Sequence, residues 1–234
     1  EARGLGLSHD TLHWDYDGSG NLQAEARQAR LDLIGQWRED CAFVLFAHTQ
    51  DDQAETLMMR LARGSGVDGL SAMSAMRSVG EWTLVRPLLS FGRTELRHFA
   101  DTLKIPYVDD PTNDDDAYAR VRIRKLIGKE GLDVQTLAET AERIQQARFA
   151  LEMRAFEAAE ALQVHSEASL GSVVLQRDGF ATVDKEPQLR LLAGALQYVS
   201  QSNYRPRFAS LKELCDRVLE GGSGTLTGCQ VSAK

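Results

Sequence analysis

The chain has 234 residues, of which 43% are hydrophobic and 26% are charged, so it can bury a core and is not an intrinsically disordered protein. Its 27 lysines and arginines against 34 acidic residues give a net charge of -7, which argues against indiscriminate binding to polyanions through overall charge. Any nucleic-acid site should therefore be a local basic patch.

The cysteines and the lack of a long apolar run indicate the compartment. Cys41, Cys215 and Cys229 are far apart and form no Cys-x-x-Cys pair, so the sequence suggests neither a disulfide framework nor a thiolate metal site. No apolar stretch approaches the roughly 20 residues that span a bilayer. We expect a cytoplasmic protein without a membrane partner, and a homodimer stays open. The chain has no initiator methionine or signal peptide, so we expect a fragment.

The first elements are a predicted strand and a predicted helix. Residues 8–16 place apolar side chains at period two, which predicts a strand, and the glycine-rich residues 17–20 predict a turn. Asn21 is a plausible N-cap for a helix over residues 22–37, which are rich in alanine and arginine.

The next segment predicts a strand, a polar turn and a helix. Residues 41–47 are all apolar, which is typical of a strand buried on both faces at the centre of a parallel sheet. Thr49 and Asp52 have the spacing of a helix capping box. Apolar residues then recur at helical spacing until Gly64. This order is half of a βαβ unit.

The pattern continues with a strand over 82–85, a helix over 94–103 and a strand over 107–108, which together predict an α/β domain with a parallel sheet. We place this domain at residues 1–128. Residues 129–234 are expected to form a long linker helix and a mostly helical second domain.

The second domain is predicted from a change of periodicity. The linker helix covers residues 137–162, where apolar side chains follow steps of three and four. A hairpin around 171–183 and helices over 187–199 and 210–219 follow. Residues from 225 onward are expected to form a strand that enters a turn.

Two acids follow the apolar strand and carry the strongest chemical signal. His48 lies at the end of that strand, and Asp52 and Glu55 lie in the first turn of the helix. Ligands of open α/β sheets bind at the carboxyl ends of strands. At about 100° per residue, Asp52, Glu55 and Arg63 fall opposite the apolar stripe, so we expect both acids to point away from the helix core.

Two carboxylates one turn apart can hold Mg²⁺, or they can orient and deprotonate an amine nucleophile. The structural alternative is that Asp52 completes the capping box and Glu55 is a solvated acid near the positive helix end. His48 has a similar alternative as a polar strand end that is hydrogen-bonded to its neighbours.

Arginines supply the candidate phosphate contacts. Arg63, Gly64 and Gly66 could bind an anion through the guanidinium and the backbone amides, or they could simply form a helix C-cap and loop. Arg120, Arg122 and Arg124 would share one face of a strand but spread around a helix, and a solvated charge run is the alternative. No glycine-rich segment has the Walker pattern.

The run from His48 to Thr56, followed by the run from Met59 to Leu70, closely resembles the tRNA(Ile)-lysidine synthetase family of PP-loop ATP pyrophosphatases. Three further segments match this family in the same order, so that the resemblance covers roughly residues 20 to 127. These segments are Gln23 to Arg30, Arg86 to Leu89 with Arg93 and Glu95 to Arg97, and Asp110 to Asn113 with Tyr118 and Arg120.

The resemblance implies a PP-loop domain of the adenine nucleotide alpha hydrolase-like fold, with ATP and Mg²⁺ as cofactors. The implied reaction adenylates C2 of the wobble cytidine in tRNA(Ile) with a CAU anticodon and releases pyrophosphate. The ε-amine of free L-lysine then displaces AMP and forms lysidine. A lysine side chain is protonated at neutral pH, so it must be captured as a cation and lose a proton before it attacks.

The resemblance also assigns roles to residues. His48, Asp52 and Glu55 are the candidate catalytic residues, and the two acids would bind Mg²⁺ or the lysine ammonium. Arg63 with Gly64 and Gly66 would face phosphate or tRNA. The three arginines at 120, 122 and 124 would line the entry for the anticodon stem, and residues 129–234 would help to hold the tRNA.

Two departures from the family pattern limit this interpretation. The family's Ser-Gly-Gly-x-Asp-Ser phosphate loop belongs upstream of residue 1, so we expect the chain as given not to turn over ATP. Val121 stands where the family usually has asparagine. Two alternatives stay open: a noncatalytic tRNA-binding module, and a PP-loop tRNA thiolase, for which a reactive cysteine pair or iron-sulfur site is missing from the pattern.

Overall fold

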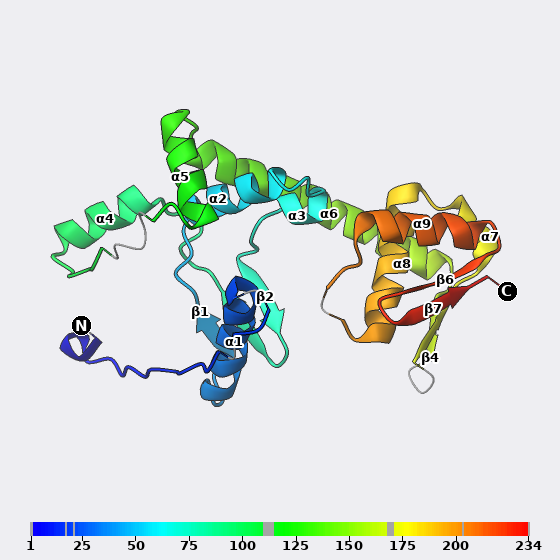
Figure 1. Cartoon of the computed structure of the whole chain (residues 1–234), viewed down its shortest axis with the longest axis horizontal. Helices are drawn as coiled ribbons and strands as arrows, with labels where there is room; N and C mark the ends of the chain where they lie inside the picture. Colours follow the sequence, from blue (N-terminus) through cyan, green and yellow to red (C-terminus); the bar gives the residue numbers. More distant parts are fainter. Residues whose placement is uncertain are drawn as a thin grey trace. The chain divides into compact units, whose positions relative to one another are not determined.

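The computed structural model describes residues 2–16, 18–20, 22–109, 115–167, 171–202 and 204–233. The chain divides into two compact units, residues 1–145 (unit 1) and residues 146–234 (unit 2), and Figure 1 labels their α-helices and most of their strands. The division falls inside the long helix α6 (Val134–Ala161) and not before it.

Unit 1 contains a three-stranded sheet in the order β1-β3-β2. Strand β1 (Phe43–Leu45) is parallel to β3 (Trp82–Val85), with Val44 opposite Leu84, whereas β2 (Met76–Val79) is antiparallel to β3. The α/β class is confirmed, but the sheet is mixed. Sequence patterning missed β2, since only its first and last residues are apolar; Gly80, at φ 58°, lets the chain turn back onto β3.

The apolar run at residues 41–47 does not form the centre of the sheet among the described residues. It contains only the three residues of β1, which lies at the edge, and Phe43 and Leu45 are 62% and 67% exposed. The predicted burial on both faces was wrong, because only the face carrying Val44 is covered within the described chain.

Helix α1 (Leu22–Trp37) has the predicted bounds and covers one face of the sheet. Leu31 packs there against Trp82 and Leu84, all of them buried. The predicted strand over residues 8–16 is wrong: this segment is exposed and has no strand partner in the described part of the chain. The predicted N-cap Asn21 lies outside the described residues.

Helix α2 (Gln50–Leu61) begins at the predicted capping box, in which Thr49 accepts from the Asp52 amide and Asp52 accepts from Thr49. Helix α4 (Arg93–Thr102) begins beside it, because the Arg93 amide donates to Asp51 Oδ2 at 2.7 Å. The short helix α3 (Val67–Leu70) follows α2, and a short 3-10 helix, η1 (Ala2–Leu5), opens the chain.

Helix α5 (Ala119–Lys129) packs against α2 and settles the open alternative for the arginine segment, which is helical. Val121 is buried in this helix. The two-residue strand predicted at 107–108 is absent, since these residues are exposed coil in the described structure. The Asp110–Asn113 segment lies outside the described residues. A second small core, centred on Leu57, Ala72 and Ala141, joins α2 to the start of α6.

Helices make up most of unit 2. The hairpin β4–β5 (His165–Glu167 and Ser172–Val174) begins earlier than predicted, and residues 177–182 form a helix instead of its second strand. The predicted terminal strand and turn form a complete hairpin in the structure. Ten buried residues, including Leu211 and Cys215, make the core. The remaining elements are α7 (Arg177–Thr182), α8 (Lys185–Ser200), α9 (Phe208–Leu219), β6 (Ser223–Leu226) and β7 (Cys229–Ser232).

None of the described helices combines the length and the apolar character needed to cross a membrane.

Candidate active site

Asp52 has two roles at the start of α2. Its Oδ2 accepts hydrogen bonds from the backbone amide and the hydroxyl of Thr49, at 2.9 and 3.0 Å, which completes the cap. Its other oxygen, Oδ1, lies 3.5 Å from Arg120 Nη1 of α5. The capping interpretation is therefore confirmed, and it leaves one carboxylate oxygen available for a cation.

Glu55 is buried, which corrects the expectation that it points to solvent. Its side chain is only 1% exposed because α5 covers this face of α2. Arg124 Nε donates to Glu55 Oε1 at 2.7 Å, and Arg120 Nε lies 3.3 Å from Oε2. The amphipathic pattern failed here, since two arginines of a second helix make burial of an acid tolerable.

The environment of Glu55 raises the pKa of its carboxyl above the ordinary value. Burial raises the pKa of Glu55, whereas the hydrogen bond from Arg124 and the charges of both arginines lower it. The negative charge of Asp52 raises it further. A carboxylate with a raised pKa is a better general base than a solvated one, so this residue is suited to accept a proton from a bound amine.

The three arginines of α5 separate into two groups. Arg120 and Arg124 are one helical turn apart; Arg120 lies against both Asp52 and Glu55, hereafter the acid pair, and Arg124 contacts Glu55. Arg122 is exposed and donates to the backbone oxygens of Asp116 and Ala117. The structure thus brings together two of the three arginines predicted for this site.

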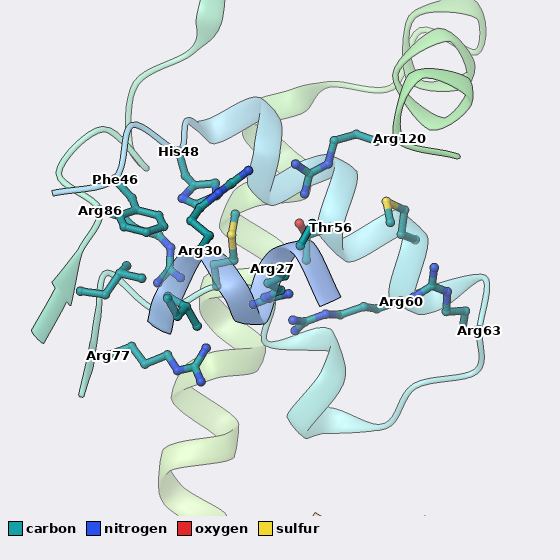
Figure 2. A pocket seen from close by; sticks show the side chains of 15 residues that line it. Arg27, Arg30, Phe46, His48, Thr56, Arg60, Arg63, Arg77, Arg86 and Arg120 are labelled. Carbon is teal, nitrogen blue, oxygen red and sulfur yellow. The ribbon is translucent and has the colours of Figure 1, made fainter. Parts of the chain in front are cut away.

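A pocket of about 400 Å³ lies beside the acid pair and is lined by seven arginines (Figure 2). These side chains come from α1, α2, β2, α5 and the segments after α2 and β3, and they surround one space together with His48 and Thr56. The arginines of this arginine pocket are Arg27, Arg30, Arg60, Arg63, Arg77, Arg86 and Arg120.

Several of these guanidinium groups are held in place by the fold. Arg86 is only 5% exposed and donates from Nη1 to Ser74 O at 2.7 Å, while its buried Nε has no hydrogen-bond partner among the described residues. Arg60 donates to the carbonyls of Gly69 and Ala72. Because these contacts fix the side chains in advance, little ordering is needed when an anion binds.

The positive charges of the pocket repel one another. Burial lowers the pKa of Arg86, and the charges of Arg27 and Arg77 lower it further. Within the described chain, none of these three arginines forms a salt bridge with an acid. A phosphate group would relieve this repulsion and supply acceptors for the arginine N–H donors.

His48 lines the arginine pocket and stacks on Phe46, with ring centroids 5.8 Å apart and an interplanar angle of 23°. Burial lowers the pKa of His48; Asp52 opposes this effect, and Arg86, Arg120 and Arg27 reinforce it. The imidazole is therefore neutral at pH 7. Its Nδ1 makes no hydrogen bond to the described residues, so the alternative of a satisfied strand end is not supported for that atom.

Only one of the three residues predicted after α2, namely Arg63, Gly64 and Gly66, belongs to this site. Arg63 lines the pocket, but the two glycines do not. Gly64 has φ 70°, as expected for a residue that ends a helix, and Gly66 is the N-cap residue of α3. The loop interpretation therefore accounts for both glycines.

The metal interpretation of the acid pair gains no support. The described residues contain no group of three or more histidine, cysteine, aspartate or glutamate side chains that could hold a metal ion. Two guanidinium groups already lie against the acid pair, and their charge opposes a divalent cation. With both guanidinium groups in place, the acid pair has no excess negative charge for a divalent cation.

Sequence reasoning missed five of the seven pocket arginines: Arg27, Arg30, Arg60, Arg77 and Arg86. The first two lie one helical turn apart in the segment 23–30, which matched the family pattern but received no role. Their helical spacing, on the same face as the apolar Leu31, was the signal that could have indicated a pocket role for Arg27 and Arg30. Arg86 directly follows a strand, which is the usual place of a ligand contact in an α/β sheet.

Comparison with known proteins gives a family match and close relatives. Residues 2–131 match the family model of the PP-loop domain. The tRNA(Ile)-lysidine synthase of Ruegeria pomeroyi is 40% identical over 99% of this chain and 56% of its own length. Those of the Wolbachia of Brugia malayi and of Bradyrhizobium sp. BTAi1 are 33% and 37% identical, over 98% and 94% of this chain and 55% and 65% of their own.

The chain therefore spans about half the length of the curated relatives it matches. A solved structure, the U34-tRNA thiolase NcsA from Methanococcus maripaludis with its [4Fe-4S] cluster, matches with a TM-score of 0.49 and 17% identity, over 62% of this chain and 53% of that one. A likeness of this degree does not distinguish one activity from another.

Proposed function

Because the chain belongs to the PP-loop domain family, we propose that it forms part of a tRNA(Ile)-lysidine synthetase that uses ATP to join L-lysine to C2 of the wobble cytidine in tRNA(Ile). The relatives with this name support the substrate class. One observation carries the proposal: a pair of carboxylates, of which Glu55 is buried and Asp52 is partly exposed, lies beside a pocket of arginines. The first suits an ammonium group, and the second suits phosphates.

The acid pair would bind the side chain of lysine. Asp52 Oδ1 and Glu55 Oε2 both face Arg120 and are the two oxygens that a second cation could share. Glu55, whose pKa burial raises, would then accept a proton from the ammonium and leave a neutral amine. The amine nitrogen forms a bond to C2, the bond from C2 to the adenylated oxygen breaks, and AMP leaves with that oxygen.

The arginine pocket would hold phosphate groups of the RNA or of the adenylated intermediate. Arg27, Arg30 and Arg86 supply donors from different elements, and the ring of His48 offers a neutral surface beside them. None of the glycine-rich segments of this chain has the Walker pattern that binds nucleotide phosphates.

The alternative of a noncatalytic tRNA-binding module would need the arginine pocket but not the acid pair. A thiolase would need reactive sulfur, and the described residues provide no cysteine cluster; Cys41 is exposed at the start of the apolar run, and the other two cysteines are buried in unit 2. The lysidine reaction is therefore the better account of Asp52 and Glu55.

The test uses the protein at its natural length with ATP, L-lysine and a tRNA(Ile) transcript carrying the CAU anticodon. Mass spectrometry of the digested tRNA should show a nucleoside heavier by lysine minus one water at the wobble position. Asp52→Asn and Glu55→Gln should each lower the rate at least about 100-fold, the range expected for a general base. An unmodified tRNA with the unaltered protein, although it binds, would favour the binding module.

A further inference from the structure

Arg120 belongs both to the acid pair and to the arginine pocket. Its Nε lies 3.3 Å from Glu55 Oε2 and its Nη1 lies 3.5 Å from Asp52 Oδ1, while the same side chain lines the pocket (Figure 2). Its side chain is 42% exposed and is therefore not locked by packing. Arg120 can thus interact with carboxylates on one side or with a bound anion on the other.

The contacts of Arg120 are looser than those of its neighbour. Arg124 donates to Glu55 Oε1 at 2.7 Å, within the range of a charge-assisted hydrogen bond. By contrast, Glu55 Oε2, which faces Arg120, is buried and makes no hydrogen bond to any described residue. Departure of Arg120 would therefore break no hydrogen bond at Glu55, and Arg124 would still hold the carboxylate.

The net charge at the acid pair depends on whether Arg120 is in place. With Arg120 and Arg124 in place, the two negative charges of the acid pair are balanced by two positive neighbours, so the pair offers no net attraction to a cation. Once Arg120 leaves, one net negative charge is exposed to Asp52 Oδ1 and Glu55 Oε2. That charge matches a single ammonium group.

We propose that Arg120 is a positioning residue that exchanges partners: an anion bound in the arginine pocket draws its guanidinium away from the acid pair and thereby opens the lysine site. Lysine then binds tightly only when phosphate groups already occupy the pocket. This inference rests on the proposed function, since it assumes that the acid pair receives lysine. It adds an order of binding that protects the acids from cations until the nucleic acid or nucleotide is present.

The test is calorimetric titration of L-lysine into the protein at its natural length, with and without saturating inorganic pyrophosphate as the probe anion. Pyrophosphate should tighten lysine binding on the order of tenfold, within the usual range of coupling between two sites. By reciprocity, lysine should tighten pyrophosphate binding by the same factor, a measurement that needs no variant.

Arg120→Ala should bind lysine without pyrophosphate as tightly as the unaltered protein does with it, and the coupling should fall below about twofold. Arg120→Gln provides a second variant that keeps side-chain length. Arg27→Ala/Arg30→Ala should also lose the coupling, which places the effective pyrophosphate in the arginine pocket. Lys129→Ala, which removes an exposed cation at the end of α5, should behave like the unaltered protein.

Three results would overturn the inference. Lysine and pyrophosphate could both bind without affecting each other, Arg120→Ala could retain the coupling, or Arg120→Ala could abolish lysine binding. In each of these cases lysine binding by the unaltered protein would still uphold the proposed function. A protein that binds no lysine under any condition would instead refute the proposed function, and the inference with it.

Discussion

Replacing Glu55 with alanine is expected to destabilise unit 1 by about 3 kcal/mol, the lower end of the cost of removing one partner from a buried ion pair. The lower end applies because the partners Arg120 and Arg124 are 42% and 28% exposed, so water compensates part of their lost contact. The loss also leaves a void beneath α5, which covers this residue.

Urea unfolding followed by tryptophan fluorescence measures this effect in the right place, since all three tryptophans of the chain, Trp14, Trp37 and Trp82, belong to unit 1. Glu139→Ala is the matched control. Glu139 forms a solvent-exposed pair with Arg143 on α6, and its loss should cost no more than about 0.5 kcal/mol. Equal losses for the two variants would show that Glu55 is not the buried centre of an ion-pair network.

The double variant Glu55→Gln/Arg124→Gln should be more stable than the sum of the two single losses predicts. Residues in one ion-pair network couple, because removing the second charge also removes the penalty of leaving it unpaired. Additive losses would place Arg124 outside the network, in conflict with its 2.7 Å hydrogen bond to Oε1.

Removing two arginines from the pocket should weaken tRNA binding strongly and reduce its salt dependence. Each phosphate contact contributes about 0.9 to the slope of log affinity against log salt concentration for duplex and about 0.7 for single strands. Arg27→Ala/Arg30→Ala should therefore lower that slope by roughly 1.4 to 1.8. At low salt, loss of two hydrogen bonds to charged groups should weaken binding by on the order of 100-fold.

The measurement is fluorescence anisotropy with labelled tRNA(Ile) at several potassium chloride concentrations. Lys129→Ala serves as the control, because it removes one exposed positive charge outside the pocket and tests the contribution of overall charge. An unchanged slope for the double variant would place the RNA phosphates elsewhere. A loss of affinity equal to that of Lys129→Ala would attribute the effect to net charge alone.

Local signals predicted much of the fold. The α1 and β3 bounds, the capping box at Thr49 and helices α8 and α9 follow from patterns within a few residues of one another, where propensity and capping act. Strand β2 could not be found this way, because its stability comes from pairing with β3 and not from its own alternation. The false strand at residues 8–16 has the opposite cause: it shows alternation, but no described strand pairs with it.

The residue types of the site could be predicted from the sequence, but the burial of Glu55 could not. Motif spacing picked out Asp52 and Glu55, whereas the burial of Glu55 depends on α5, which begins more than 60 residues later. Helical periodicity considers one helix and one core, so it assigned the acid to solvent. The pocket arginines come from six separate segments, and only the tertiary fold brings them to one space.

The proposed reaction requires that the lysine ammonium binds between two carboxylates beside the arginine pocket. A crystal structure of the protein at its natural length with L-lysine and pyrophosphate tests this most directly. We expect the lysine nitrogen within hydrogen-bond distance of Asp52 Oδ1 and Glu55 Oε2, with Arg120 turned toward the pocket. Lysine bound elsewhere, with Arg120 still on both acids, would contradict it.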